Sequence, residues 1–162
     1  MNRNYLLFLI FIEFLFFSLP ADAQSGKVPP FRMVQKNGKM FRAEDLPIGK
    51  PIIIIYFSPE CHDCQSLTEK VTARISDFKG ASIAMITYLS LESVLQFADK
   101  NKLDKYPNIY IGTEGNSIFV MNYYNITDFP FIALYTKNGD LIKRYYNKEV
   151  DVDDLIRRLN NL

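Results

Sequence analysis

Residues 52–64 have the sequence IIIIYFSPECHDC, in which an apolar run leads into a turn that carries both cysteines of the chain. Four isoleucines followed by two aromatic residues are typical of an inner β-strand covered on both faces. Ser58 and Pro59 fit the N-cap and first position of a helix, so we expect Cys61 and Cys64 in its first turn. Free backbone N–H groups and the helix dipole stabilise an anion there, which favours a reactive Cys61 thiolate with Cys64 as its resolving partner.

The residues after this motif predict an amphipathic helix. Apolar side chains recur at spacings of four, four and three residues and form one face, and Gly80 marks the expected end. The apolar positions are Leu67, Val71, Ile75 and Phe78. A strand followed directly by Cys-x-x-Cys and a docked helix resembles the thioredoxin superfamily, in which this dithiol exchanges disulfides with other proteins.

Two β-hairpins are predicted on either side of this unit. Asn37-Gly38 is the residue pair that a tight type I′ turn requires, and Lys137-Asn138-Gly139-Asp140 is a second strong hairpin signal. The strands of these hairpins are expected at residues 31–34 and 39–42, and at residues 131–135 and 141–145. The sequence therefore predicts antiparallel pairs before and after the cysteine helix.

The remaining elements complete an α/β sheet. A second inner strand follows the cysteine helix, and two parallel strands linked by a helix form a right-handed crossover. Ser90 caps the next helix, and Asp151 begins a closing helix with Arg157 and Arg158 near its end, where cations are favoured. A short strand and a short helix form an insertion before the second half. The predicted ranges are 82–88 for the strand, 91–102 for the helix, and 108–111 and 117–124 for the insertion.

This order of elements resembles the TlpA/ResA branch of the thioredoxin superfamily, which consists of exported thiol-disulfide oxidoreductases, over roughly residues 31–162. The resemblance implies a thioredoxin-like α/β fold, with a central mixed sheet flanked by helices, an N-terminal hairpin and a short insertion before the cis-proline half. The local matches are Ser-Pro-Glu-Cys-His-Asp-Cys at residues 58–64 and Thr127-Asp128-Phe129-Pro130-Phe131.

The second of these matches resembles the loop in which the superfamily places a cis-proline facing the dithiol. It implies that the Phe129–Pro130 bond is cis and that the backbone before Pro130 pairs with an extended substrate segment beside the reactive sulfur. The other interpretation of Pro130 is an ordinary proline at the start of a strand.

Two positions depart from the family pattern. Glu60 precedes the first cysteine, where the family usually has an aromatic residue, and Ile55 replaces the buried acid that thioredoxin carries six residues before that cysteine. Asp63, next to the second cysteine, and a bound water are the candidates to transfer a proton instead, although Asp63 also fits a solvated first-turn carboxylate. His62 would favour the Cys61 thiolate when protonated, or else it is an exposed loop residue.

The composition is that of one soluble domain with a sizeable core. Apolar residues make up 48% of the chain, and 19 basic side chains nearly balance 18 acidic ones, so no strong field of one sign suggests nucleic acid as a partner. Cys61, His62 and Cys64 could offer two sulfurs and a nitrogen to copper or zinc, and an extracytoplasmic metal-binding protein is therefore the alternative function. A structural zinc site takes four ligands, however, and the chain has no second Cys/His cluster.

Residues 1–23 resemble a signal peptide. Arg3 supplies the charged start, residues 5–19 the apolar run, and Ala21-Asp22-Ala23 the cleavage site. The apolar run is short for a membrane span and is interrupted by an acid, so we prefer a cleaved signal to a retained anchor. Residues 24–162 then form the thioredoxin-like domain, in the periplasm or another extracytoplasmic compartment, with no stable membrane span after cleavage.

The sequence thus predicts an exported thiol-disulfide oxidoreductase. The Cys61 thiolate attacks a disulfide, and Cys64 resolves the mixed disulfide; the reverse cycle oxidises a dithiol. This couple is itself the cofactor, so no metal or nucleotide is needed. The expected partners are protein disulfides or dithiols and a redox protein that recharges the couple, and we expect a monomer. A purely structural disulfide is less attractive, because so short a loop restrains the unfolded chain little.

Overall fold

The structure is a computed structural model that describes residues 26–162, so the predicted signal peptide at residues 1–23 lies outside the described part. A single mixed sheet of seven strands runs through it, in the order β2-β1-β5-β4-β3-β6-β7. The strands are β1 (Arg32–Gln35), β2 (Met40–Arg42), β3 (Ile52–Tyr56), β4 (Ser82–Thr87), β5 (Ile109–Thr113), β6 (Phe131–Tyr135) and β7 (Leu141–Tyr146). The α-helices are α2 (His62–Ala73), α3 (Leu91–Lys100), α4 (Phe119–Tyr124) and α5 (Val152–Leu159).

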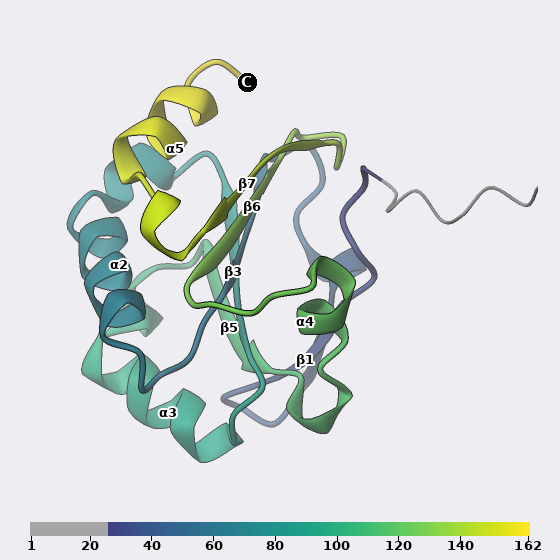
Figure 1. Cartoon of the computed structure of the whole chain (residues 1–162), viewed down its shortest axis with the longest axis vertical. Helices are drawn as coiled ribbons and strands as arrows, with labels where there is room; N and C mark the ends of the chain where they lie inside the picture. Colours follow the sequence, from purple (N-terminus) through teal and green to yellow (C-terminus); the bar gives the residue numbers. More distant parts are fainter. Residues whose placement is uncertain (1–25) are drawn as a thin grey trace, which may run out of the picture.

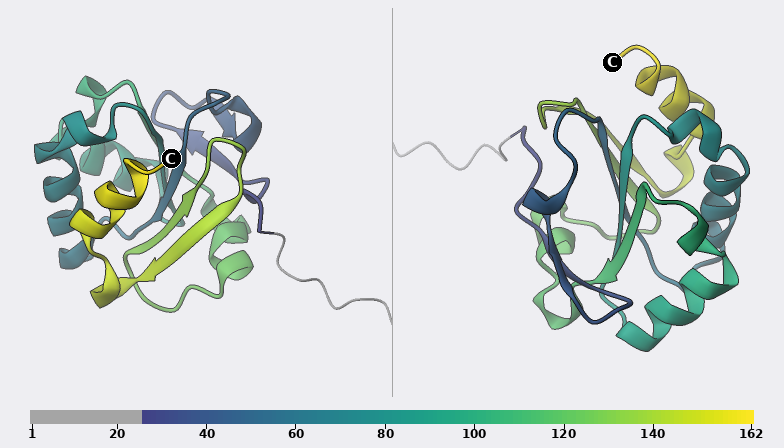
Figure 2. Two further views of the ribbon diagram at one scale, coloured as in Figure 1. Left: turned by 90° about the horizontal axis from the view of Figure 1, so that it is seen from above. Right: turned by 180° about the vertical axis from the view of Figure 1, so that it is seen from behind.

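The helices cover the sheet unequally. Helices α2, α3 and α5 pack on one face, whereas α4 and the segment around the N-terminal hairpin cover the other (Figures 1 and 2). This arrangement agrees with the predicted central mixed sheet flanked by helices, with a hairpin before it and an insertion before the second half. Among residues 26–162, none of the helices has the length and apolar character required to cross a membrane.

Strand β3 is the centre of the sheet, as its sequence predicts. It pairs in parallel with β4 and antiparallel with β6. Ile53 and Ile55 point into the core beneath the three helices, whereas Ile54 and Tyr56 point into the core beneath α4. Because both faces of the strand are buried, an uninterrupted apolar run fits this position.

The cysteine helix begins later than the sequence predicts. Its N-cap is Cys61 and not Ser58, whose carbonyl instead accepts the Cys61 N–H at 3.0 Å in a preceding turn. The helix also ends at Ala73, because Arg74 leaves the helical conformation, and a separate 3-10 turn (Ile75–Phe78) follows. The predicted apolar face nevertheless survives, with Leu67, Val71 and Phe78 buried and Ile75 packed against them.

Both predicted hairpins form, but the prediction of a type I′ turn at Asn37-Gly38 is wrong. Only Gly38 has a positive φ, +76°, and the turn is closed by the Gly38 N–H on the Gln35 carbonyl at 2.8 Å. Gly139 has the same role in the second hairpin, with a φ of +78°. A wider loop that ends in one left-handed residue therefore makes each connection, so the glycine is required and the preceding asparagine is not.

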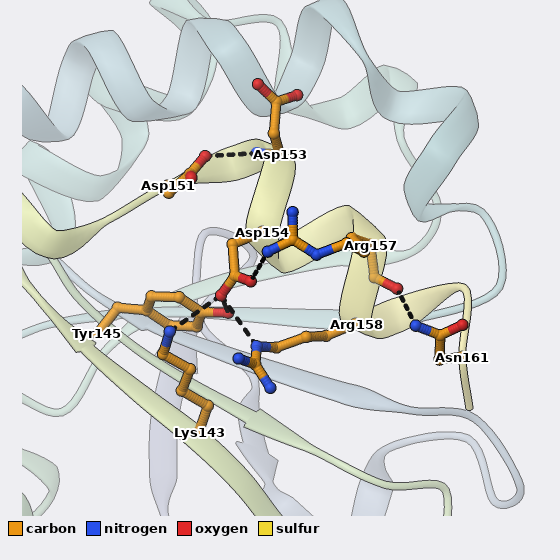
Figure 3. Close-up of polar contacts among 8 residues, drawn as sticks. All are labelled: Lys143, Tyr145, Asp151, Asp153, Asp154, Arg157, Arg158 and Asn161. Atoms are coloured by element: carbon orange, nitrogen blue, oxygen red, sulfur yellow. Dashed lines mark hydrogen bonds and ion pairs between the residues drawn. The ribbon is translucent and has the colours of Figure 1, made fainter.

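The closing helix is attached to β7 through one buried carboxylate (Figure 3). Asp154 accepts hydrogen bonds from the Lys143 ammonium at 3.0 Å, the Tyr145 hydroxyl at 2.8 Å and the Arg158 guanidinium at 2.9 Å, and it also pairs with Arg157. Together, the Arg158 guanidinium, the Lys143 ammonium and the Tyr145 hydroxyl hold the pKa of Asp154 well below its usual range. The predicted cap of α3 at Ser90 is confirmed, and α5 begins at Asp151 as predicted, with the Asp151 carboxylate accepting the Asp153 N–H.

Candidate redox site

The two cysteines lie where the carboxyl end of β3 meets the amino end of β6. These strands are adjacent and antiparallel, with Tyr56 opposite Phe131. The turn that follows β3 and the loop that precedes β6 are therefore brought to the same edge of the sheet. This topology places Cys61 beside the Phe129–Pro130 loop, although 68 residues separate Cys61 from Phe129.

The two thiols differ in exposure. Cys61 is partly exposed at the N-cap, whereas Cys64 is 1% exposed beneath the first turn of α2, and neither is in a disulfide. The Cys64 backbone N–H donates to the Cys61 sulfur at 3.3 Å. Burial, and next the hydrogen bond with Cys61, raise the pKa of Cys64 far above its ordinary value, so this thiol stays protonated at neutral pH. Incoming molecules can therefore reach Cys61 and not Cys64.

The Phe129–Pro130 peptide bond is cis, as the resemblance implies. The Phe129 carbonyl lies 3.7 Å from the Cys61 sulfur and accepts its thiol hydrogen. The Cys61 sulfur thus has a backbone donor, from Cys64, and a backbone acceptor, from Phe129. The structure brings together the predicted cysteines and the predicted proline loop.

The charged side chains of the motif point outward. Glu60, His62 and Asp63 are all exposed. Of the three, the structure links only the Asp63 charge to a sulfur, as the smallest of the contributions that raise the pKa of Cys64. Two roles therefore stay predictions: proton transfer by Asp63, and stabilisation of the Cys61 thiolate by His62. Within residues 26–162, no three His, Cys, Asp or Glu side chains are grouped to hold a metal ion, so the geometry does not favour the metal-binding alternative.

Three further side chains surround the loop and were not predicted as part of the site. The rings of Tyr56 and Tyr88 stack on the ring of Phe129, with centroids 6.0 and 5.9 Å away. The Tyr56 hydroxyl in turn donates to the buried carboxylate of Glu114 at 2.7 Å. The sequence signal for Tyr56 was only that of a strand residue, and Glu114 directly follows β5 with no motif around it.

Comparisons by sequence find no similar protein, whereas comparisons of structure find many. No protein-family model matches the chain, and no curated protein sequence is detectably similar to it. Solved structures match over most of its length. A secreted disulfide oxidoreductase of Mycobacterium tuberculosis, homologous to DsbE of Escherichia coli, has a TM-score of 0.67 at 19% identity, over 88% of this chain and 100% of that one. The fold is that of thioredoxin.

Other proteins with this thioredoxin-like fold give the same result. The thioredoxin domain of a thiol-disulfide oxidoreductase from Bacteroides vulgatus has a TM-score of 0.69 at 20% identity, covering 87% of this chain and 98% of that one. A thiol-disulfide oxidoreductase from Bacteroides fragilis has a TM-score of 0.68 at 13% identity, covering 83% and 98%. Such low identity establishes the fold, and the activity has to be argued from the site.

Proposed function

We propose that the protein is an exported thiol-disulfide oxidoreductase that reduces or exchanges disulfides in other proteins. The observation that carries this proposal is the asymmetric dithiol. Cys61 is accessible and lies between a backbone N–H and a backbone carbonyl, whereas Cys64 is buried with a raised pKa one helical turn away. An attacking thiol and a protected resolving thiol need this difference in access.

The proposed reaction is a two-step exchange. The Cys61 thiolate attacks one sulfur of a substrate disulfide, a new sulfur–sulfur bond forms, and the other substrate sulfur leaves as a thiolate that takes up a proton. Cys64 then loses its proton, attacks the Cys61 sulfur and releases the second substrate thiol. Two electrons and two protons pass to the substrate, and a Cys61–Cys64 disulfide remains. A partner dithiol restores the reduced form, and the same steps in reverse oxidise a substrate dithiol.

The surroundings of the dithiol support these steps. The N-terminus of α2 stabilises negative charge on a thiolate at the N-cap, which is the position of Cys61. The raised pKa of Cys64 prevents both sulfurs from ionising together, and it requires an acceptor for the Cys64 proton in the second step. Asp63 or a water molecule is the proposed acceptor. The couple carries the electrons itself, so the proposal needs no metal or nucleotide.

The compartment and the partners complete the proposal. The signal-like residues 1–23 support a location outside the cytoplasm, and the similar protein of M. tuberculosis is described as secreted. There a dithiol requires a supply of electrons if it is to act as a reductant. We therefore propose protein disulfides as substrates, a separate dithiol protein as the source of electrons, and a monomer as the working unit.

Insulin disulfide reduction with dithiothreitol tests the proposed function. Wild-type protein should accelerate the precipitation of the insulin B chain, and Cys61→Ser should not. Cys64→Ser, which keeps the attacking sulfur, should accumulate mixed disulfides through Cys61, while Cys61→Ser accumulates none. A wild-type rate equal to that of Cys61→Ser, or mixed disulfides formed through Cys64, would contradict the proposal. Titration of the couple against glutathione buffers then gives the direction of electron flow.

A further inference from the structure

The ring of Phe129 stacks with two tyrosines. Tyr56 comes from the end of β3 and Tyr88 from the loop after β4, and each ring lies within about 30° of parallel to that of Phe129. The carbonyl of Phe129 is the group that faces the Cys61 sulfur. Since the ring and the carbonyl belong to one residue, contacts that fix the ring also fix the backbone opposite the dithiol.

Both tyrosines are anchored by the end of β5. The Tyr56 hydroxyl donates to the Glu114 carboxylate, and the Glu114 backbone N–H donates to the Thr87 carbonyl at 2.9 Å, directly before Tyr88. The Thr113 hydroxyl donates to the Leu89 carbonyl, directly after Tyr88. The two residues Thr113 and Glu114 therefore locate both rings that hold Phe129.

Glu114 is an unusual group for this position. It is 9% exposed, and its second oxygen accepts the Val120 N–H at 2.9 Å at the start of α4. Within the described residues it forms no ion pair with a lysine or arginine. A buried carboxylate that has only neutral donors is expensive in free energy, and a fold that needed only packing here would be served by an apolar side chain. Burial and the Glu114 carboxylate both raise the pKa of Tyr56, which keeps its hydroxyl a donor.

We propose that Glu114, Tyr56 and Tyr88 are positioning residues that hold the Phe129 backbone in register with the dithiol, so that a disulfide within an extended polypeptide is preferred to a small disulfide. This inference rests on the proposed function. An extended substrate segment pairs with the backbone edge beside Cys61, whereas a small disulfide has no such segment. Loosening Phe129 therefore penalises the polypeptide substrate and not the attack of sulfur on sulfur.

A second pair of tyrosines on the same face of the sheet provides a matched control. The hydroxyls of Tyr124 and Tyr135 hydrogen-bond to each other in the same core as Tyr56. In the described part of the chain, the rings stacked on Phe129 are those of Tyr56 and Tyr88, and neither member of this second pair is among them. Tyr135→Phe thus removes one buried hydroxyl, as Tyr56→Phe does, without touching the ring stack.

The test compares kcat/KM for insulin with kcat/KM for hydroxyethyl disulfide. Tyr56→Phe should lower the insulin value about tenfold and the hydroxyethyl disulfide value less than about twofold, because one buried hydrogen bond of a positioning group is lost. Glu114→Gln should act in the same direction. Tyr88→Leu, at a partly exposed position that forms no hydrogen bond with the Glu114 carboxylate, should also lower the insulin value more than the hydroxyethyl disulfide value, with less risk to folding. Tyr135→Phe should leave the ratio of the two values at the wild-type level.

The outcomes separate this inference from the function on which it rests. Equal losses on both substrates, no loss on either, or an equal shift of the ratio in Tyr135→Phe would overturn the positioning role while leaving the oxidoreductase intact. A wild-type protein that turns over neither disulfide would overturn the proposed function, and the inference with it.

Discussion

Asp154 and Glu114 are both buried carboxylates, and their partners are of opposite kinds. Asp154 is surrounded by an ammonium, two guanidinium groups and a phenol hydroxyl (Figure 3). Glu114 has a phenol hydroxyl and a backbone N–H. Cationic partners add Coulomb attraction to the hydrogen bonds, so Asp154 stabilises the fold. Glu114 gains less from its partners, and its value lies in what it aligns beside the dithiol.

The largest expected effect on stability is that of Asp154→Ala. This change removes the shared acceptor of Tyr145, Lys143 and Arg158 and with it the polar link between α5 and β7, so the free energy of unfolding should fall by about 2 to 3 kcal/mol. Urea denaturation followed by circular dichroism measures the change. Asp153→Ala is the matched control, because the Asp153 carboxylate is exposed and its pairing with Arg74 contributes little. Equal losses in both variants would remove the contrast between the two carboxylates.

Acidification should erase the contribution of Asp154. Its pKa is lower in the folded protein than the usual value of about 4 in the unfolded chain. The stabilisation is therefore fully present above pH of about 5 and is lost as the pH falls through the unfolded value toward the folded one. Urea titrations between pH 7 and 3 should show a shallower decline for Asp154→Asn than for wild type. Parallel declines would show that Asp154 is not held in its charged form by the fold.

Glu114→Gln should sharpen the comparison by separating stability from activity. The amide has a single oxygen for two donors, the Tyr56 hydroxyl and the Val120 N–H, so the side chain is no longer fixed by both contacts and unfolding should become easier by about 1 kcal/mol. Insulin reduction should nevertheless fall about tenfold. For Asp154→Asn we expect the reverse pattern, a larger loss of stability with unchanged insulin turnover at a temperature where the variant is folded.

The smallest expected effect is that of Arg157→Ala. The Arg157 side chain is 67% exposed, and Asp154 keeps its other three partners when it is removed. Exposed ion pairs contribute little because solvent screens them and the long side chain loses entropy. The denaturation midpoint should stay within error of wild type, and a clear shift would mean that the four partners of Asp154 act as one cooperative network.

The predictable parts of the molecule are those that depend on local pattern. Buried strand β3, the cysteine helix and both hairpins follow from apolar runs, turn residues and a short motif, whereas the cis bond before Pro130 was implied by the family resemblance. The exact start of the helix did not, because Cys61 takes the cap that Ser58 also fitted. The pairing of Tyr56 with Glu114 spans 58 residues, and no local pattern encodes a contact of that range. Arg157 and Arg158 were assigned to the helix dipole, whereas the structure pairs both with Asp154.

The Cys61 sulfur, which we propose to be the attacking atom, also caps helix α2. In the dithiol state, the first turn of α2 is held by the hydrogen bond from the Cys64 N–H to the Cys61 sulfur. Once a disulfide joins the two residues, a covalent link spans the same turn. Reduction therefore replaces a covalent disulfide by a hydrogen bond that can open and close. The N-terminal end of α2 should open more often in the reduced protein than in the oxidised one. Amide hydrogen exchange in the first turns of α2 should follow the redox state of the protein, slow when oxidised and faster when reduced.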